Sequence, residues 1–444
     1  MTRDDRTLRR AAGALAVGLA GVSLGKLVEP RDVRGRKWGL TTLVRAMLVG
    51  MLAGMRSLKE TERLTDSLSP AMRTRLRVSR RVPDTTMREL AMRLSLQGVL
   101  GLLHGQVRTM GRKKQLAATR LPCDVLAIDG HCQVTDIDDG VFAQRQGEGH
   151  LVVRLMTCSL VSAAAAPIVH VTPVPRETNE MGVLPQVMQA LRAAYGDELF
   201  RLVTADAGMA SEANARLLHE EMRVGYLFAL KENQPDLLSH AEGLLGHLPH
   251  ALAQGHPRER IGQFRHVRRI WLAREDEGVN AWTHARTVLR VEYQVTTLDG
   301  DVKSTLNRYF VSNERAGRFT PEQRLAVVRA HWRVENDGHK TLDAPRSRLC
   351  GDEGAGDIVL GEDDHPWIRD PRGMLVLQLL RRIACNALNT LRLVTLRPRT
   401  KSSHRKRLVE WSHLLGALRR ALLAAAEHQL AGLRWPPALA VAPA

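Results

Sequence analysis

Apolar positions recur at helical spacing through the first quarter of the chain. Leu40 to Met55 is apolar apart from Arg45, and Ser57 to Leu68 has the pattern of a second amphipathic helix. A third helix is predicted from Asp84 to Leu103, because a proline and two small polar residues mark its start. These patterns predict an α-helical N-terminal domain over residues 1–120. Its basic cluster would either contact DNA phosphates, which we favour, or form a solvated face; the cluster is Arg73, Arg75, Arg77, Arg80 and Arg81.

After residue 120 the pattern changes to short apolar runs bounded by turn residues, which is typical of strands. Three strands follow one another before strands alternate with helices, one of which Ser211 can cap. This order predicts an α/β fold with a mixed sheet flanked by helices, whose first part is residues 121–235. The predicted strands are 123–129, roughly 141–143, 150–160, 166–173, 199–205 and 226–230.

The next stretch, residues 236–319, alternates apolar and polar positions and predicts a β-rich unit. Thr320, Pro321 and Gln323 then form a well-marked helix start. We interpret residues 236–319 as an insertion in a domain that resumes over 320–400, because an unstructured loop of that length is uncommon. A basic helical tail, 401–444, would either contact DNA or a second subunit, or pack on the core.

Three acidic residues lie beside or within apolar elements. Asp129 closes one predicted strand and Asp206 closes another, and the ends of two such strands can meet at one edge of a sheet. Glu335 follows Leu325 and Val328 on the apolar stripe of the helix that starts at Thr320. Taken singly, each acid has an ordinary structural explanation, such as a turn or a salt bridge. Their combination favours a shared site.

A carboxylate is costly to bury unless a cation accompanies it. Three oxygen ligands that leave positions open for water and phosphate suit Mg²⁺ or Mn²⁺, and two such ions can promote phosphoryl transfer. We therefore predict that Asp129, Asp206 and Glu335 form a catalytic, metal-binding triad for two ions.

Composition adds a partner to this picture. The 444 residues carry a net charge of +18 with a pI of about 10.5, which favours a polyanion, with DNA or RNA first and an anionic membrane second. Five cysteines without a C-x-x-C pair speak against a disulfide scaffold or a zinc module and fit a reducing cytoplasm. Residues 3–24 imitate a signal peptide, but they continue into a basic stretch that we interpret as part of the folded domain.

Several short segments stand in a characteristic order along the chain. They include both strand-end acids and the segment around Glu335. The segments are Ala127-Ile128-Asp129-Gly130, Thr178-Asn179-Glu180, Val203-Thr204-Ala205-Asp206-Ala207, Leu230-Lys231-Glu232-Asn233-Gln234-Pro235 and His331-Trp332-Arg333-Val334-Glu335-Asn336.

In this order they resemble bacterial insertion-sequence transposases of the DDE type, and most of all the H-repeat-associated branch. The resemblance implies an RNase H-like catalytic domain with the three acids as its metal ligands. It also implies cleavage of element ends in double-stranded DNA and their joining to target DNA, in a homodimer or larger assembly, in the bacterial cytoplasm at the nucleoid and without a membrane.

Residues near the triad receive roles from the same resemblance. Lys231, Asn233 and Gln234 would hold a phosphate or a base edge, although Asn and Gln also commonly satisfy backbone groups of a loop. His331 and Arg333 would steady DNA beside Glu335.

The tryptophans have two interpretations. Trp332 faces the apolar stripe and is expected in the core. Trp271 and Trp282, in the inserted unit, would either stack on an extruded base or pack in the sheet.

Two other functions stay open at this stage. One is a metal-dependent nuclease that cuts without joining, and the other is a catalytically inactive, transposase-derived DNA-binding or regulatory protein. Departures from the branch's pattern, such as His131 in place of Lys, leave the triad intact but keep the inactive alternative open.

Overall fold

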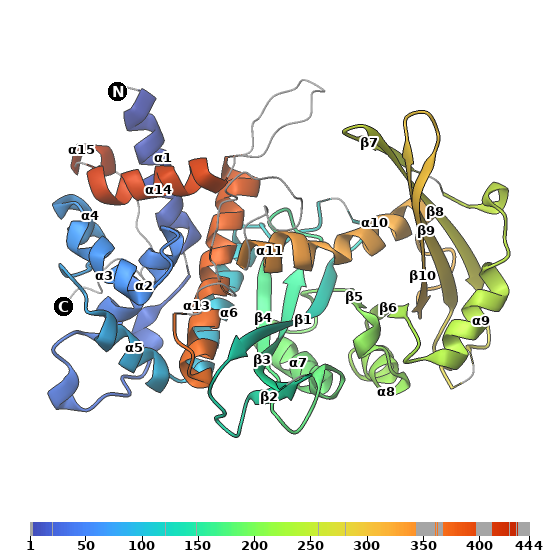
Figure 1. Ribbon diagram of the computed structural model, residues 1–444, viewed down its shortest axis with the longest axis horizontal. Coiled ribbons are helices and arrows are strands. Elements are labelled where there is room, and N and C mark those ends of the chain that lie inside the picture. Colours follow the sequence, from blue (N-terminus) through green and yellow to red (C-terminus); the bar gives the residue numbers. More distant parts are fainter. Residues whose placement is uncertain are drawn as a thin grey trace.

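The computed structural model describes residues 3–19, 21–119, 121–147, 149–255, 257–279, 281–342, 360, 362, 367–396, 411–425, 427–431 and 433. A layer of helices forms one end of the molecule, a mixed sheet crosses its middle, and long antiparallel strands form the other end (Figure 1). Among the described residues no helix is both long enough and apolar enough to cross a membrane.

The helical end combines the first and last parts of the chain. Ser57 caps α3 as its sequence suggests, whereas the helix expected over 84–103 is two helices, because Leu94 is extended and Ser95 caps a new start. The helices are α1 (Arg3–Gly18), α2 (Leu40–Leu52), α3 (Leu58–Ser67), α4 (Pro70–Leu76), α5 (Asp84–Arg93), α6 (Leu96–Arg112), α13 (Pro371–Asn389), α14 (Trp411–Ala424) and α15 (Glu427–Leu430), with short turns η1 (Leu24–Lys26), η2 (Val33–Gly35) and η7 (Thr390–Thr395).

Helix α13 connects this layer to the sheet. It packs against α2, α5 and α6 on one side and against β4 on the other, where Asn386 binds both backbone groups of Ile168. Helix α14 packs on α1, so the described part of the C-terminal tail lies on the N-terminal helices (Figure 1). The basic residues 397–407, expected to precede that helix, lie outside the described residues.

Within the described residues, ten strands form one mixed sheet. The order is β2-β3-β1-β5-β6-β10-β9-β8-β7, with β4 also paired to β3, and β1, β5 and β6 are parallel. The predicted α/β fold, a mixed sheet flanked by helices, is therefore confirmed. The strands are β1 (Val125–Thr135), β2 (Ala143–Gln146), β3 (His150–Leu160), β4 (Ile168–Pro173), β5 (Leu202–Ala205), β6 (Gly225–Leu230), β7 (Arg258–Ile261), β8 (Phe264–Arg274), β9 (Thr287–Thr297) and β10 (Val302–Ser312).

The β-rich segment is continuous with this sheet. Strand β10 pairs antiparallel with β6, from Tyr309 opposite Leu230 to Ser312 opposite Leu227. The segment's last strand therefore extends the row of strands that carries the acids.

Both faces of the sheet are buried. Neighbouring residues of a strand point to opposite sides, so each strand contributes side chains to two separate cores. Leu126 and Ile128 of β1 face the larger core, which includes α7, whereas Val125 and Ala127 face a second core that includes α10. The helices around the sheet are α7 (Glu180–Tyr195), α8 (Glu212–Arg216), α9 (Pro235–Leu245), α10 (Pro321–His331) and α11 (Lys340–Leu342), with turns η3 (Ala207–Met209), η4 (Leu217–Glu221), η5 (His250–Leu252) and η6 (Val334–His339).

Candidate active site

Asp129 and Asp206 lie side by side at the sheet edge. Strands β1 and β5 are parallel, and the last residues in register, Ile128 and Ala205, each precede one of the acids. Both side chains are half-buried. The predicted convergence of the two acids is therefore present, but only Asp206 ends a strand, because β1 continues past Asp129 to Thr135.

The surroundings of Asp206 disfavour its ionised form. Burial, and then the negative charge of Asp129, raise the pKa of Asp206, while His331 and Lys231 act in the opposite direction. Its Oδ1 atom is buried and has no hydrogen-bond partner among the described residues. Such a carboxylate calls for a cation or a proton.

Glu335 reaches the same place from the side of the sheet that α10 covers. Helix α10 begins with the expected capping box, in which Thr320 and Gln323 bind each other's backbone, and it packs through Leu325 and Val328. The regular helix ends at His331, and Glu335 lies on the π-helical segment η6 that follows. The helix is therefore shorter than its apolar pattern predicts.

The three acids line a common cavity of about 650 Å³. Lys231, His331, Trp332 and Arg308 also border it. Within the part of the chain that the structure describes, no three His, Cys, Asp or Glu side chains are grouped closely enough to hold one metal ion. The carboxylates thus share a cavity without forming one closed coordination shell.

The three residues of the Lys-x-Asn-Gln segment differ in their contacts. Lys231 is exposed at the cavity, where a phosphate could reach it. Asn233 donates to the carbonyl oxygen of Ala207 at 2.6 Å, and Gln234 donates to that of Ala210 at 3.0 Å. These amides hold the loop after Asp206, so their contacts support the loop interpretation over a DNA contact.

His331 and Arg333 also differ. His331 Nδ1 lies 3.1 Å from the Thr204 hydroxyl, and burial lowers the pKa of His331 although Asp129 and Asp206 oppose that shift. Burial therefore favours the neutral form of the imidazole at the cavity wall.

Arg333 is used inside the protein. Its guanidinium donates to the carbonyl oxygens of Val161, Ala163 and Ala164, and Nε donates to Asp337 at 2.7 Å. These bonds tie η6 to the turn after β3. They do not support the DNA contact predicted for Arg333.

Trp332 does not lie where its sequence pattern predicts. Trp332 is 38% exposed, with the Arg308 guanidinium 4.3 Å from its ring centroid, so the expectation that it lies in the core is wrong. The helix ends at His331, which turns the next side chain out of the core and toward the cavity.

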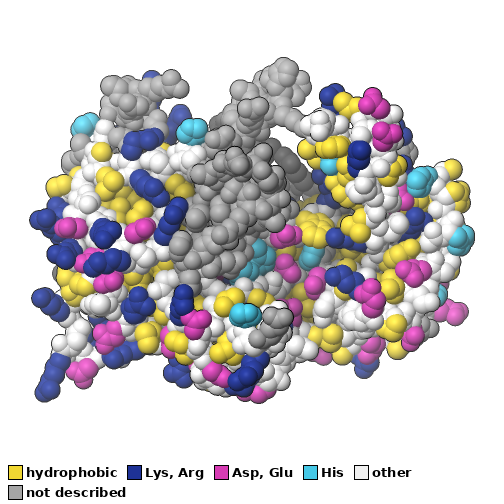
Figure 2. Space-filling view, in the orientation of Figure 1, with side chains coloured by type: hydrophobic (Ala, Val, Ile, Leu, Met, Phe, Trp, Pro, Cys, Tyr) yellow, Lys and Arg dark blue, Asp and Glu magenta, His cyan; other side chains and the backbone are white. Residues whose placement is uncertain are grey.

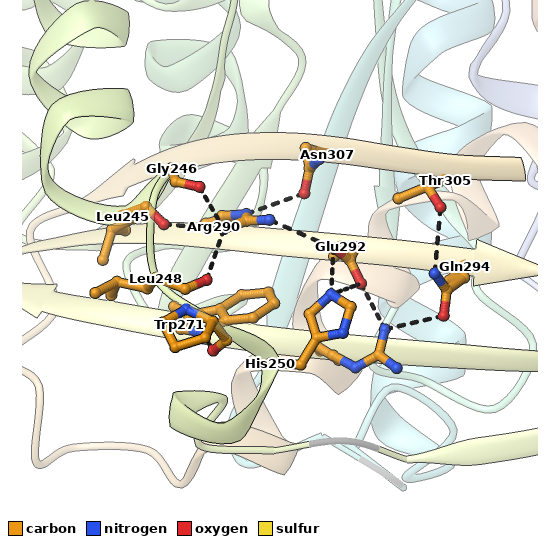
Figure 3. A network of polar contacts seen from close by, with 12 residues as sticks. Leu245, Gly246, Leu248, His250, Trp271, Arg290, Glu292, Gln294, Thr305 and Asn307 are labelled. Atoms are coloured by element: carbon orange, nitrogen blue, oxygen red, sulfur yellow. Dashed lines mark hydrogen bonds and ion pairs between the residues drawn. The ribbon is translucent and has the colours of Figure 1, made fainter.

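Trp271 and Trp282 are buried, at 1% and 5% exposure, which supports sheet packing over base stacking. Figure 3 shows Trp271 beneath Arg290, whose guanidinium reaches the carbonyl oxygens of the turn after α9. Trp271 itself donates to the carbonyl oxygen of Pro249. Both rings are therefore part of the packing of the extended sheet.

The comparisons with known proteins identify the family. A family model described as Transposase DDE domain matches residues 124–354, more than half of the chain. The chain belongs to this DDE transposase family. Among solved structures, it is similar to the piggyBac transposase in a cryo-EM structure of its synaptic complex with hairpin DNA, at 10% sequence identity and a TM-score of 0.43, over 93% of this chain and 80% of that chain. No curated protein matches the chain.

Family membership leaves the finer assignment open. The match does not reach the H-repeat-associated branch, which stays a prediction. The DDE domain comprises Asp129, Asp206, Glu335 and the whole β-rich segment between Asp206 and Glu335.

The structure adds two residues to the surroundings of the DDE acids. His339 Nε2 lies 3.5 Å from Asp129 Oδ2, and its ring stacks on His131 at 4.8 Å between centroids. Glu180, at the start of α7, lies against Gly130. The sequence had singled out Thr178-Asn179-Glu180 by its order among the motifs, but gave its carboxylate no role.

Basic residues lie mainly outside the cavity of this transposase domain. Lys and Arg side chains cover much of the helical end of the molecule (Figure 2). In the cluster after α4, Arg80 pairs with Asp66 and Arg81 with Glu62, whereas Arg77 is exposed. Part of this predicted phosphate-binding cluster is therefore neutralised by α3.

Proposed function

We propose that this DDE-family chain is a DNA transposase that cleaves the ends of an insertion element and joins them to target DNA. The observation that supports it is the convergence of Asp129, Asp206 and Glu335 on one cavity from three separate parts of the matched segment. Cleavage and joining are both in-line displacements at phosphorus, so one acidic site can serve both.

The carboxylates fit Mg²⁺ or Mn²⁺, with two ions in the site. Oxygen donors suit these hard cations, and the unpaired, buried Oδ1 of Asp206 is the atom that most needs one. A divalent cation would also remove the repulsion between Asp129 and Asp206. The chemistry that such ions supply is activation of the attacking oxygen and stabilisation of the leaving one.

Positive and neutral groups around the cavity have distinct tasks in this proposal. Lys231 and Arg308 would attract the scissile phosphate, because both border the cavity and carry a positive charge. His331, neutral and held by Thr204, would offer a hydrogen bond without repelling a cation. Arg333, Asn233 and Gln234 would keep the loops that carry the acids in place.

The partner in this proposal is double-stranded DNA. The net charge of +18 favours a polyanion, and exposed arginines such as Arg77 lie on the helical end. A dimer or larger assembly is part of the proposal, since two element ends have to be held together.

The test is a cleavage and joining assay on the element's own ends. Full-length protein is incubated with labelled end DNA and a target plasmid, with Mg²⁺, with Mn²⁺ or with EDTA. The variants are Asp206→Asn and Glu335→Gln, and the exposed Glu177→Gln serves as the control. We expect metal-dependent cleavage and strand joining by the wild type and the control, and neither by the two site variants.

Other outcomes separate the remaining functions. Cleavage without joined products would replace the proposal with a nuclease. DNA binding that is independent of metal, without cleavage under any condition and unchanged in Asp206→Asn, would support an inactive DNA-binding protein.

A further inference from the structure

Glu180 occupies a position next to the acids that no role has yet explained. It is the first residue of α7, and Asn179 caps that helix through the backbone N–H of Gly182. The Glu180 carboxylate is half-buried and, among the described residues, makes no hydrogen bond and no ion pair. A helix start is a favourable place for an acid. The direction of this side chain, however, needs another reason.

The side chain points at the strand that carries Asp129. A Cβ atom added to Gly130 would lie 2.1 Å from Glu180 Oε1 and 2.8 Å from Oε2. Glycine leaves that space to the end of the Glu180 side chain. Neighbouring residues of a strand point to opposite faces, so the side chain of Asp129 lies on the other face of β1. The Asp-Gly pair thus lets one carboxylate leave the strand on one face while another approaches it from the other face.

The approach places like charges together. Burial raises the pKa of Glu180, and the negative charges of Asp206 and Asp129 raise it further, against the opposing effect of Arg154. Arg154 does not compensate by a direct contact, since its Nε is buried without a hydrogen bond among the described residues. A fold that brings a further acid toward two others is unfavourable unless a cation joins them.

A second group points to a cation at the same place. The His339 side chain is 8% exposed, and neither ring nitrogen makes a hydrogen bond within the described residues. Its Nε2 is directed at Asp129 Oδ2 at 3.5 Å. The buried His339 imidazole, which faces Asp129, and the unpaired Oδ1 of Asp206 therefore both lie beside the carboxylates that Glu180 approaches.

We propose that Glu180 is a fourth acidic ligand for the divalent cations held by Asp129 and Asp206. The inference rests on the proposed function and adds a residue to its site. Asp129, Asp206 and Glu335 line the cavity, whereas Glu180 lies beside it against Gly130, so cation binding would draw the Glu180 side chain past Gly130 by a change of rotamer.

The test measures cation binding and needs neither DNA nor catalysis. Metal-free, full-length protein is titrated with MnCl₂, and free Mn²⁺ is followed by its electron paramagnetic resonance signal. Glu180→Gln removes the charge but keeps the shape. Gly130→Ala leaves every carboxylate in the chain but fills the space into which that of Glu180 points. Glu177→Gln, an exposed acid on the same loop, is the matched control.

We expect Glu180→Gln and Gly130→Ala each to lose one bound Mn²⁺ or to weaken its affinity by at least about tenfold, and Glu177→Gln to bind as the wild type does. In EDTA, Glu180→Gln should melt at the same or a higher temperature, because a repelled charge is removed. A structural role at the helix start would lower that temperature instead.

Asp206→Asn distinguishes failure of this inference from failure of the proposed function. Unchanged Mn²⁺ binding in both Glu180→Gln and Gly130→Ala, together with loss of binding in Asp206→Asn, would overturn the role of Glu180 alone. Unchanged binding in Asp206→Asn, or no binding by the wild type, would overturn the metal site itself.

Discussion

Replacing Arg333 with Lys separates two roles for this residue, a brace inside the protein and a contact to DNA. The wild-type guanidinium serves three carbonyl acceptors and Asp337 at once. A lysine keeps the charge but lacks the planar fork, so we expect about two of these charge-assisted bonds to be lost. At roughly 1.5 kcal/mol each, the segment η6 would lose about 3 kcal/mol of local stability.

Hydrogen exchange read by mass spectrometry measures this loss where it occurs. About 3 kcal/mol corresponds to roughly hundredfold faster amide exchange, which we expect in peptides over residues 331–342 and over the turn 161–167. Arg329→Lys is the matched control, because Arg329 lies one turn earlier on α10 and makes one ion pair, with Glu259 at 3.3 Å. DNA affinity should keep its salt dependence in both variants.

The opposite pattern would refute the reasoning. If Arg333→Ala leaves amide exchange unchanged but reduces the slope of log affinity against log salt by about one, Arg333 holds a phosphate, as its motif alone predicts.

Three further predictions concern other parts of the chain. Because the pKa of Asp206 is raised in the folded protein, its ionised form disfavours folding, and stability is lost as pH rises through the raised pKa. Asp206→Asn should therefore have a higher melting temperature than the wild type at neutral pH in EDTA. Mg²⁺ should reduce that difference in melting temperature. Arg290→Met leaves three backbone carbonyls without their shared donor, while Glu292 keeps Arg269 and His250. Urea denaturation should therefore show a loss of about 3–5 kcal/mol, and an unchanged midpoint would contradict the network of Figure 3. Burial lowers the pKa of His104 to about 4 and that of His170 to about 3, below the pKa of a histidine in the unfolded chain. As pH falls, the unfolded state therefore binds protons before the folded state does. The folded protein should lose stability as pH falls from about 6.5 towards 4. Replacing both histidines with Gln should flatten thermal stability over that window by a few kcal/mol relative to the wild type, and an unchanged pH profile would show that the pair does not titrate on unfolding.

Sequence periodicity predicted the sheet well where strands are buried. The runs ending at Asp129 and Asp206 are strands β1 and β5 because apolar side chains on both faces of a central strand leave a continuous apolar signal. The break at Leu94 was missed, since Ser95 fits an amphipathic helix as well as it fits a cap. Local pattern could not reveal that β10 joins β6, because strand pairing depends on distant residues.

The site divides in the same way. The meeting of Asp129 and Asp206, which follows from the apolar runs that precede them, could be predicted from the sequence. The roles of residues that depend on where their donors point, such as Arg333 and Asn233, could not, because a basic or amide side chain reads the same whether it binds a phosphate or a backbone carbonyl.

Gly130 gives the Asp-Gly motif a structural role in addition to the charge of Asp129. In a local interpretation, Asp-Gly marks a turn, yet β1 continues through Gly130 to Thr135 as a strand paired with β3. The glycine is therefore not needed for a turn. It leaves room for a carboxylate from α7, distant in sequence, which lies where a side chain would be. A conformational explanation would predict that alanine at this position disturbs the strand, whereas the close approach of Glu180 predicts an intact strand with altered cation binding.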